Sequence, residues 1–126
     1  MKTKILITGA SGFIGTNLLE YFKNKGFEVS NFDIVGPRNK SHIKYWEQVD
    51  ITDLKFLIDK VNDIKPDYIV HLAARTDLNE NDGIEYYGAN IQGVENIIKV
   101  STKAGGIKRV VFASSMLVNE VGYKPK

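Results

Sequence analysis

The chain has 126 residues, of which 43% are apolar and 25% are charged. This length and composition are typical of one folded domain and exclude a disordered tail. The sequence contains no cysteine, which excludes disulfides, thiolate zinc sites and cysteine nucleophiles. Seventeen basic and fifteen acidic residues leave a net charge of +2, which is too small for a nucleic-acid-binding surface.

Membrane insertion and secretion are also disfavoured. The longest stretch without a charge, residues 5–19, is interrupted by three glycines and is shorter than the roughly 20 apolar residues of a membrane span. Residues 1–7 imitate the start of a secretory signal, but the apolar run ends at Thr8 after three residues. A buried strand is therefore the favoured interpretation, and we expect a cytoplasmic protein.

Short apolar segments alternate along the chain with longer segments of helical periodicity. Near-continuous apolar or aromatic runs are typical of strands buried on both faces, and they predict strands at residues 5–8, 27–33, 44–49, 68–72 and 109–113. The spacing of Ile14, Leu18 and Phe22, with Leu19 beside them, predicts the buried face of a first helix, which Gly26 ends.

Two more helices are predicted. One is capped by Thr52 or Asp53 and cannot continue through Pro66. A longer one covers residues 83–104, with its apolar face at Tyr87, Ile91, Val94 and Ile98. Strands separated by such helices predict right-handed crossovers. The expected fold is a single α/β domain over residues 1–126, a doubly wound parallel sheet of Rossmann type with strand order 3-2-1-4-5.

A glycine-rich turn joins the first strand to the first helix. Gly9, Gly12 and Gly15 have the spacing G-x-x-G-x-x-G. Gly9 allows a sharp turn, Gly12 leaves room for a pyrophosphate, and Gly15 lets the helix pack close to the sheet. The amides at the helix start then face the phosphates. A dinucleotide is the favoured ligand, and a structural turn or another nucleotide is the alternative.

Asp33 ends the second strand, 18 residues after Gly15. A carboxylate there can accept both hydroxyls of an adenosine ribose and would repel a 2′-phosphate, which favours NAD over NADP. Arg38 and Lys40 could weaken this preference, and a solvated strand-end acid is the plain alternative. A P-loop is excluded because Gly15-Thr16-Asn17 contains no lysine. A methyltransferase would share the turn and the acid, and it remains a rival.

Four further segments recur in a familiar order: Val49-Asp50-Ile51-Thr52-Asp53, His71-Leu72-Ala73-Ala74, Asn90-Ile91-Gln92-Gly93 and Phe112-Ala113-Ser114-Ser115. Together with the glycine-rich turn Gly9-Ala10-Ser11-Gly12-Phe13-Ile14-Gly15, they resemble the extended short-chain dehydrogenase/reductase family. The similarity is to its NAD-dependent epimerase/dehydratase branch, which acts on nucleotide sugars, and it runs from about Ile5 to Val118.

The resemblance implies roles for these segments. Asp50 would accept a hydrogen bond from the adenine amine, and the backbone of Ile51 would lie against the ring. Leu72, Ala73 and Ala74 would pass beneath the ribose and phosphates, and Asn90 would reach the nicotinamide-side ribose. Ser115 is the implied catalytic serine, which bonds the sugar oxygen being oxidised.

Each assignment has a structural alternative. His71 is interpreted as a packed histidine in preference to a base, and Asn90 could be an ordinary surface residue. Ser114 and Ser115 could cap a turn, and a phosphate contact by Arg75 is a minor possibility.

The chemistry of the family needs a Tyr-x-x-x-Lys pair, normally about two dozen residues after the serine, whereas Lys126 follows Ser115 by 11 residues. Tyr21 and Lys25 match the pattern only by coincidence, because they lie at the far end of the first helix.

We therefore expect the NAD-binding amino-terminal part of a nucleotide-sugar epimerase/dehydratase, without the last strands, the Tyr/Lys helix or the substrate domain. The alternative is a stand-alone dinucleotide-binding module with a regulatory or scaffolding role. The expected cofactor is NAD, with NADP less favoured, and no metal is expected. The expected partners are a nucleotide sugar and a second copy of the chain in a homodimer.

Overall fold

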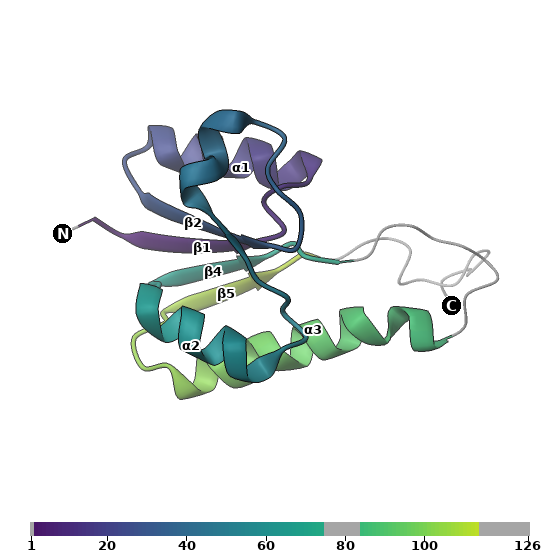
Figure 1. Cartoon of the computed structure of the whole chain (residues 1–126). Helices are drawn as coiled ribbons and strands as arrows, with labels where there is room; N and C mark the ends of the chain where they lie inside the picture. Colours follow the sequence, from purple (N-terminus) through teal and green to yellow (C-terminus); the bar gives the residue numbers. More distant parts are fainter. Residues whose placement is uncertain (1, 75–83, 114–126) are drawn as a thin grey trace, which may run out of the picture.

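The computed structural model describes residues 2–74 and 84–113, which form one sheet with helices on both faces (Figure 1). The strands are β1 (Lys4–Thr8), β2 (Glu28–Asp33), β3 (Trp46–Gln48), β4 (Tyr68–His71) and β5 (Arg109–Phe112). The helices are α1 (Phe13–Asn24), the short 3-10 helix η1 (Lys40–Tyr45), α2 (Leu54–Ile64) and α3 (Ile84–Lys103). None of the helices in the described ranges combines the length and the apolar character that a membrane crossing requires.

The strand order is β3-β2-β1-β4-β5, and all neighbouring strands are parallel. The predicted doubly wound Rossmann sheet is thereby confirmed. β1 is the central strand, since Ile5 lies opposite Val29 on β2 and Tyr68 on β4. The buried-strand interpretation of the first residues is also correct. Because all strands run the same way, their carboxyl ends meet at one edge of the sheet, where open α/β sheets bind ligands.

Alternate residues of the strands fill two separate cores. On one face, Leu6, Phe32 and Ile69 pack with Leu57 of α2 and Ile97 of α3. On the other face, Ile5, Ile7 and Val29 pack with Leu19 of α1. Figure 1 shows α1 on one side of the sheet and α2 and α3 on the other. This two-sided burial is the physical reason that the strands are continuously apolar.

The buried face of α1 differs from the prediction at its first position. Leu18 and Phe22 pack against the core as expected, but Ile14 is 67% exposed. The fully buried residues of the helix are Leu19, as expected, and Gly15, which takes the place of Ile14. Ile14 lies in the first turn of α1, just past the carboxyl end of β1, where there is no sheet for it to cover.

The predicted apolar face of α3 is exposed wherever the structure describes its side chains. Ile91 and Ile98 are 57% and 48% exposed, and Val94 is also exposed. The buried residues of α3 are instead Gly93, Asn96, Ile97 and Val100. Tyr87 lies outside the described side chains. The helix is turned so that Gly93 faces Ile51, a contact that apolar spacing alone does not predict.

The strand predicted at residues 44–49 is shorter in the structure. Only residues 46–48 pair with β2, and the preceding residues form η1, whose amino terminus is capped by Asn39 through Ser41 N at 2.9 Å. His42 in η1 is buried, and its Nε2 lies 2.7 Å from Glu20 Oε2 on α1. This contact, with help from Lys23, holds the pKa of the Glu20 carboxyl below its usual range. The contact fastens the segment between β2 and β3 to α1.

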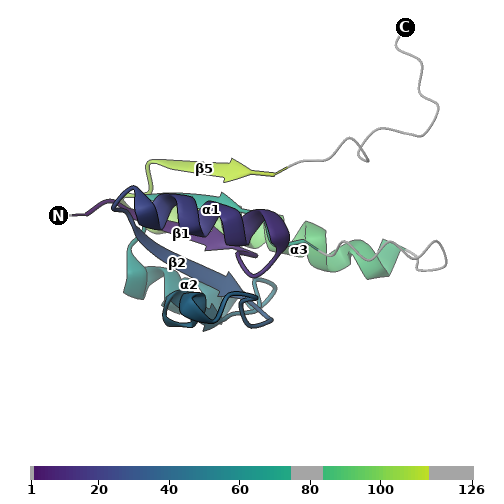
Figure 2. The same ribbon diagram turned by 90° about the horizontal axis from the view of Figure 1, so that it is seen from above.

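β5 forms an edge of the sheet. Seen from above in Figure 2, α1 lies across β1 and β2, and β5 lies beyond it. Val111 and Phe112 on β5 are 49% and 40% exposed. Among the described residues, β5 and α3 therefore leave apolar side chains exposed to solvent.

Candidate functional site

The turn between β1 and α1 depends on two glycines for purely steric reasons. Gly9 has a φ of +79°, and a Cβ placed there would lie 2.7 Å from the backbone nitrogen of Ala73 after β4. A Cβ on Gly15 would lie 2.4 Å from Ala10 Cα. Neither contact can be relieved by moving a flexible side chain, because both involve backbone atoms. Gly9 and Gly15 are therefore needed by the fold itself.

Gly12 is different. Its backbone is extended, with φ −77° and ψ 179°, a conformation open to any residue. A Cβ there would meet only Gly9 O, at 3.4 Å, which is an ordinary contact distance. The fold does not need a glycine at this position. The missing side chain leaves open the space directly in front of the first turn of α1.

Most of the amides in the turn already have partners inside the protein. The acceptors are Phe32 O for Gly9 N at 2.8 Å, Asn31 Oδ1 for Ala10 N at 2.9 Å, Asp33 Oδ2 for Ser11 N at 3.1 Å and Gly9 O for Gly12 N at 3.2 Å. In contrast, no group in the described part of the chain accepts from the amides of Phe13 and Ile14. These amides and the positive end of the helix dipole could hold an anion, and they make up the candidate anion site.

Asp33 is held beside this anion site. Its half-buried carboxylate accepts from Ser11 N at 3.1 Å through Oδ2 and from Val35 N at 3.2 Å through Oδ1. Each carboxylate oxygen has a second lone pair, so both oxygens can still accept hydroxyl donors. The Trp46 indole donates to Asp33 O at 3.0 Å, which fixes the end of β2. The carboxylate and the free amides are thus parts of one rigid unit.

Asp50 and Ile51 follow β3 at the same edge of the sheet. Asp50 is exposed, and its Oδ1 accepts from both the amide and the hydroxyl of Thr52, at 2.9 and 2.7 Å. Ile51 O accepts from Asn96 Nδ2 at 2.8 Å. A Cβ on Gly93 would lie 2.5 Å from Ile51 Cδ1. The small Gly93 and the buried Asn96 therefore hold the Ile51 backbone against α3.

Thr8 connects the ends of β1 and β4. Its hydroxyl accepts from the amides of Leu72 and Ala73, both at 3.2 Å, and lies 2.6 Å from His71 Nδ1. The Leu72 amide is shared with Thr8 O at 3.0 Å. A hydroxyl proton directed to Nδ1 would suit a neutral His71 ring that carries its proton on Nε2. Burial lowers the pKa of His71 below its ordinary value of 6.5, and the ring also contacts Phe112 edge-on. This environment matches the packed-histidine interpretation.

All of the predicted cofactor residues lie in the described ranges, and they end or follow β1 to β4 or lie in α1 or α3. They are Gly9, Ser11, Gly12, Phe13, Ile14, Gly15, Asp33, Asp50, Ile51, Leu72, Ala73, Ala74 and Asn90. Leu72 and Ala73 are half-buried and Ala74 is exposed. Asn90 is half-buried and makes contacts within the protein. The predicted catalytic Ser115, with Ser114 and Arg75, lies outside the described residues.

Sequence reasoning missed three buried polar residues that shape this edge, namely Thr8, Asn31 and Asn96. All three bind backbone or loop atoms that are distant in sequence. The only available signal was a polar side chain inside an otherwise apolar strand or helix face.

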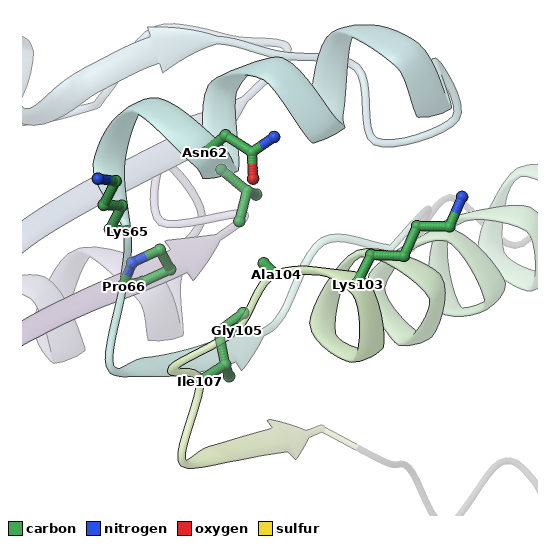
Figure 3. Close-up of a pocket in the computed structure, with 8 residues that line it drawn as sticks. Asn62, Lys65, Pro66, Lys103, Ala104, Gly105 and Ile107 are labelled. Carbon is green, nitrogen blue, oxygen red and sulfur yellow. The ribbon is translucent and has the colours of Figure 1, made fainter.

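No cluster of metal-ligating side chains occurs among the residues that the structure describes. A cavity of about 260 Å³ lies elsewhere, between the carboxyl-terminal ends of α2 and α3 and the starts of β4 and β5 (Figure 3). Val61, Pro66 and Ile107 are among its walls. It lies at the amino edge of the sheet, opposite the glycine-rich turn, and is separate from the candidate site.

Comparison with known proteins agrees with this geometry. Residues 5–124 match the model of the NAD dependent epimerase/dehydratase family. The chain is 36% identical over 96 residues to a GDP-6-deoxy-D-talose 4-dehydrogenase of Aggregatibacter actinomycetemcomitans, covering 76% of this chain and 29% of that protein. It is 34% identical to a 3-beta-hydroxysteroid dehydrogenase of Mycolicibacterium neoaurum, covering 89% of this chain and 32% of that protein.

A solved structure is similar as well. It is the Bordetella bronchiseptica enzyme WbmG in complex with NAD and UDP, with 30% identity and a TM-score of 0.75 over 89% of this chain and 37% of that one. The chain thus spans about a third of the length of the relatives it matches.

The geometry of Gly12 yields a first prediction. Gly12→Val should lower the affinity for NAD more than about 100-fold, because the side chain would block the anion site, removing charge-assisted bonds worth roughly 3 kcal/mol. The loss of folding stability should stay within about 1 kcal/mol, the cost of a poorer helix cap. Calorimetric titration and urea unfolding measure the two effects.

Gly105→Val is the matched control, since a Cβ at Gly105 meets nothing within 4 Å and lies at the far end of α3. Gly15→Val, by contrast, should fail to fold. Full NAD affinity in folded Gly12→Val would show that the phosphates do not lie in front of α1.

The buried ring of His71 yields a prediction about pH. The pKa of His71 is lower in the folded chain than in the unfolded chain. As the pH decreases through the ordinary histidine pKa, the unfolded chain therefore binds more protons than the folded chain, and the free energy of unfolding decreases. The free energy of unfolding should therefore drop more steeply from about pH 7.5 to about pH 5 in the natural chain than in His71→Gln. Urea unfolding across this pH range measures both slopes, and parallel slopes would contradict the assignment.

Proposed function

Because the chain belongs to the NAD-dependent epimerase/dehydratase family, we propose that it is the NAD-binding part of a nucleotide-sugar epimerase or dehydratase. The observation that carries the proposal is the rigid unit formed by the free amides of Phe13 and Ile14 and the carboxylate of Asp33. An anion site next to a diol acceptor suits the pyrophosphate and ribose of a dinucleotide.

The residues present fit NAD in detail. The amides of Phe13 and Ile14 would donate to the pyrophosphate in the space that Gly12 leaves open. Asp33 would accept the ribose hydroxyls, and Asp50 with the Ile51 backbone would hold the adenine. The strand end at Leu72, Ala73 and Ala74 and the α3 residue Asn90 would complete the site on the nicotinamide side.

The proposed chemistry is hydride transfer at a sugar carbon. NAD, when bound, supplies the hydride acceptor. On the protein side, Ser115 would orient the sugar hydroxyl. A tyrosine whose phenolate is stabilised by a lysine would take the proton, a contribution of roughly 10²- to 10⁴-fold. By the family resemblance, this pair normally follows the serine by about two dozen residues.

A nucleotide sugar is the proposed substrate. Support comes from the GDP-sugar dehydrogenase relative and from the UDP bound to WbmG. The steroid dehydrogenase relative acts on a different class of molecule, so the substrate needs a direct test. We also propose a cytoplasmic protein and a homodimer. The exposed Ile91, Val94 and Ile98 on α3 support the dimer.

The role of Asp33 can be tested by cofactor preference. Asp33→Ala should lower the affinity for NAD roughly 10- to 150-fold, since a hydrogen bond to a charged group is worth about 1.5–3 kcal/mol. The affinity for NADP should fall less, because the substitution also removes the repulsion between the Asp33 carboxylate and the 2′-phosphate. Fluorescence of Trp46, the only tryptophan, bonded to Asp33 O, can report both titrations.

The ratio of the two losses is the decisive quantity, because any distortion of the loop affects both ligands alike. Asp59→Ala removes an exposed carboxylate on α2 and should leave both affinities unchanged. Equal losses of affinity for NAD and NADP in Asp33→Ala would contradict the proposal that Asp33 binds the ribose.

Turnover tests the proposed reaction. The 126-residue chain should bind NAD yet form no NADH or altered sugar with UDP-, GDP- or dTDP-sugars, because no Tyr-x-x-x-Lys pair follows Ser115 in its sequence. A version extended through the following helix and carboxyl-terminal domain should turn over one of them. Comparable rates for the two proteins would contradict the proposal. If the extended protein turned over only a steroid, the proposed nucleotide-sugar substrate would be wrong.

A further inference from the structure

Asn31 is a polar residue at a buried strand position where an apolar residue is usual. It lies in the middle of β2, is completely buried, and points to the same face as Val29. Asparagine is depleted in strands, and a buried amide is tolerated only when its polar atoms are satisfied. A residue that departs from the local pattern of a strand is expected to have a specific task.

Both side-chain hydrogen bonds of Asn31 go to the glycine-rich turn. Its Oδ1 accepts from Ala10 N at 2.9 Å, and its Nδ2 donates to Ser11 Oγ at 3.1 Å. The backbone amide of Ala10 can only donate, so the atom facing it must be the oxygen. This fixes the orientation of the side-chain amide.

The connection continues from Ser11 to Asp33. Ser11 Oγ receives the Asn31 amide and donates its own proton to Val35 O at 2.9 Å. Ser11 N and Val35 N both donate to the Asp33 carboxylate, at 3.1 and 3.2 Å. Asn31, Ser11, Val35 and Asp33 therefore form one continuous network of hydrogen bonds.

The place of this network in the chain gives it a function. Phe13 and Ile14, which carry the free amides, follow Ser11 by two and three residues. A hydrogen bond to a phosphate weakens steeply when its distance or angle is disturbed. Any shift of the turn relative to β2 would move the anion site away from the ribose acceptor. Asn31 is too deeply buried to contact a ligand, so its influence must be exerted through the turn.

We propose that Asn31 is a positioning residue that sets the anion site relative to Asp33, so that recognition of pyrophosphate and recognition of ribose are coupled. This inference rests on the proposed function and deepens it. Asn31 itself touches no part of the cofactor. It determines whether the amides of Phe13 and Ile14 and the carboxylate of Asp33 can act on one ligand together.

The test compares ligands with and without phosphates. Asn31→Leu has a similar size but makes neither hydrogen bond. It should lower the affinities for ADP and NAD about 10-fold or more. The affinity for adenosine, which has no phosphate, should change less than about 3-fold. Calorimetric titration of the 126-residue chain with the three ligands measures these ratios.

Val29→Ala is the matched control. Val29 is buried on the same face of the same strand, so its truncation loosens the core without touching the network. It should weaken ADP and adenosine by the same small factor. If Asn31→Leu also weakens ADP and adenosine equally, Asn31 is merely a core residue and the inference is overturned.

Two further variants keep the inference testable if Asn31→Leu does not fold. Asn31→Asp preserves the shape and the bond to Ala10, and Ser11→Ala preserves Asn31 but removes the hydroxyl. Both should weaken ADP more than adenosine. Unchanged ADP-to-adenosine ratios in these two variants would overturn the inference.

The coupling between Asn31 and Asp33 can be measured separately. In the double variant Asn31→Leu/Asp33→Ala, the loss of NAD affinity should be smaller than the product of the single losses, because both act through Ser11. A loss equal to the product would overturn the coupling. Failure of the unsubstituted chain to bind ADP or NAD would instead overturn the proposed function, and the inference with it.

Discussion

The close approach of Gly9 to the backbone of Ala73 is the constraint on which the rest of the structure depends. With a φ of +79° and no room for a Cβ, Gly9 lets the chain leave β1 beneath the end of β4 and turn directly into α1. The hydroxyl of Thr8 secures the same junction by accepting from the amides of Leu72 and Ala73. Because β1 is the central strand, this junction determines where α1 begins and which amides face outward.

β2 supplies the second half of the arrangement. Its last residues use a backbone carbonyl, a side-chain amide and a carboxylate to bind three successive amides of the turn. A glycine-rich turn is often described as a row of amides that surround a phosphate. Here most of that row is engaged with β2, and the ligand is left with the first turn of the helix. The protein thereby gains a rigid turn and a small, well-defined anion site.

Much of this was predictable from local pattern. Five strands, the helices between them and the parallel order follow from apolar runs, caps and breakers, and all were found. The glycine spacing and Asp33 indicated a dinucleotide site, while the choice between an oxidoreductase and a methyltransferase depended on longer motifs and on the family match. The buried face of α1 was partly wrong, since Ile14 is exposed, and the apolar face of α3 at Ile91 and Ile98 is exposed as well. Helical spacing places side chains on a common stripe but does not say how far the helix is rotated toward the sheet.

The sequence by itself determined the elements, their order and the edge of the sheet that carries the site, because these depend on periodicity and on the conformations open to glycine and proline. Only the tertiary structure decided which polar groups remain available there. Asn31, Thr8 and Asn96 bind atoms that are 20 to 65 residues away in sequence. The amides of Phe13 and Ile14 are distinguished from those of Gly9 and Ser11 only by what lies opposite them. Hydrogen-bond partners are chosen by proximity in space, and proximity is a property of the folded chain.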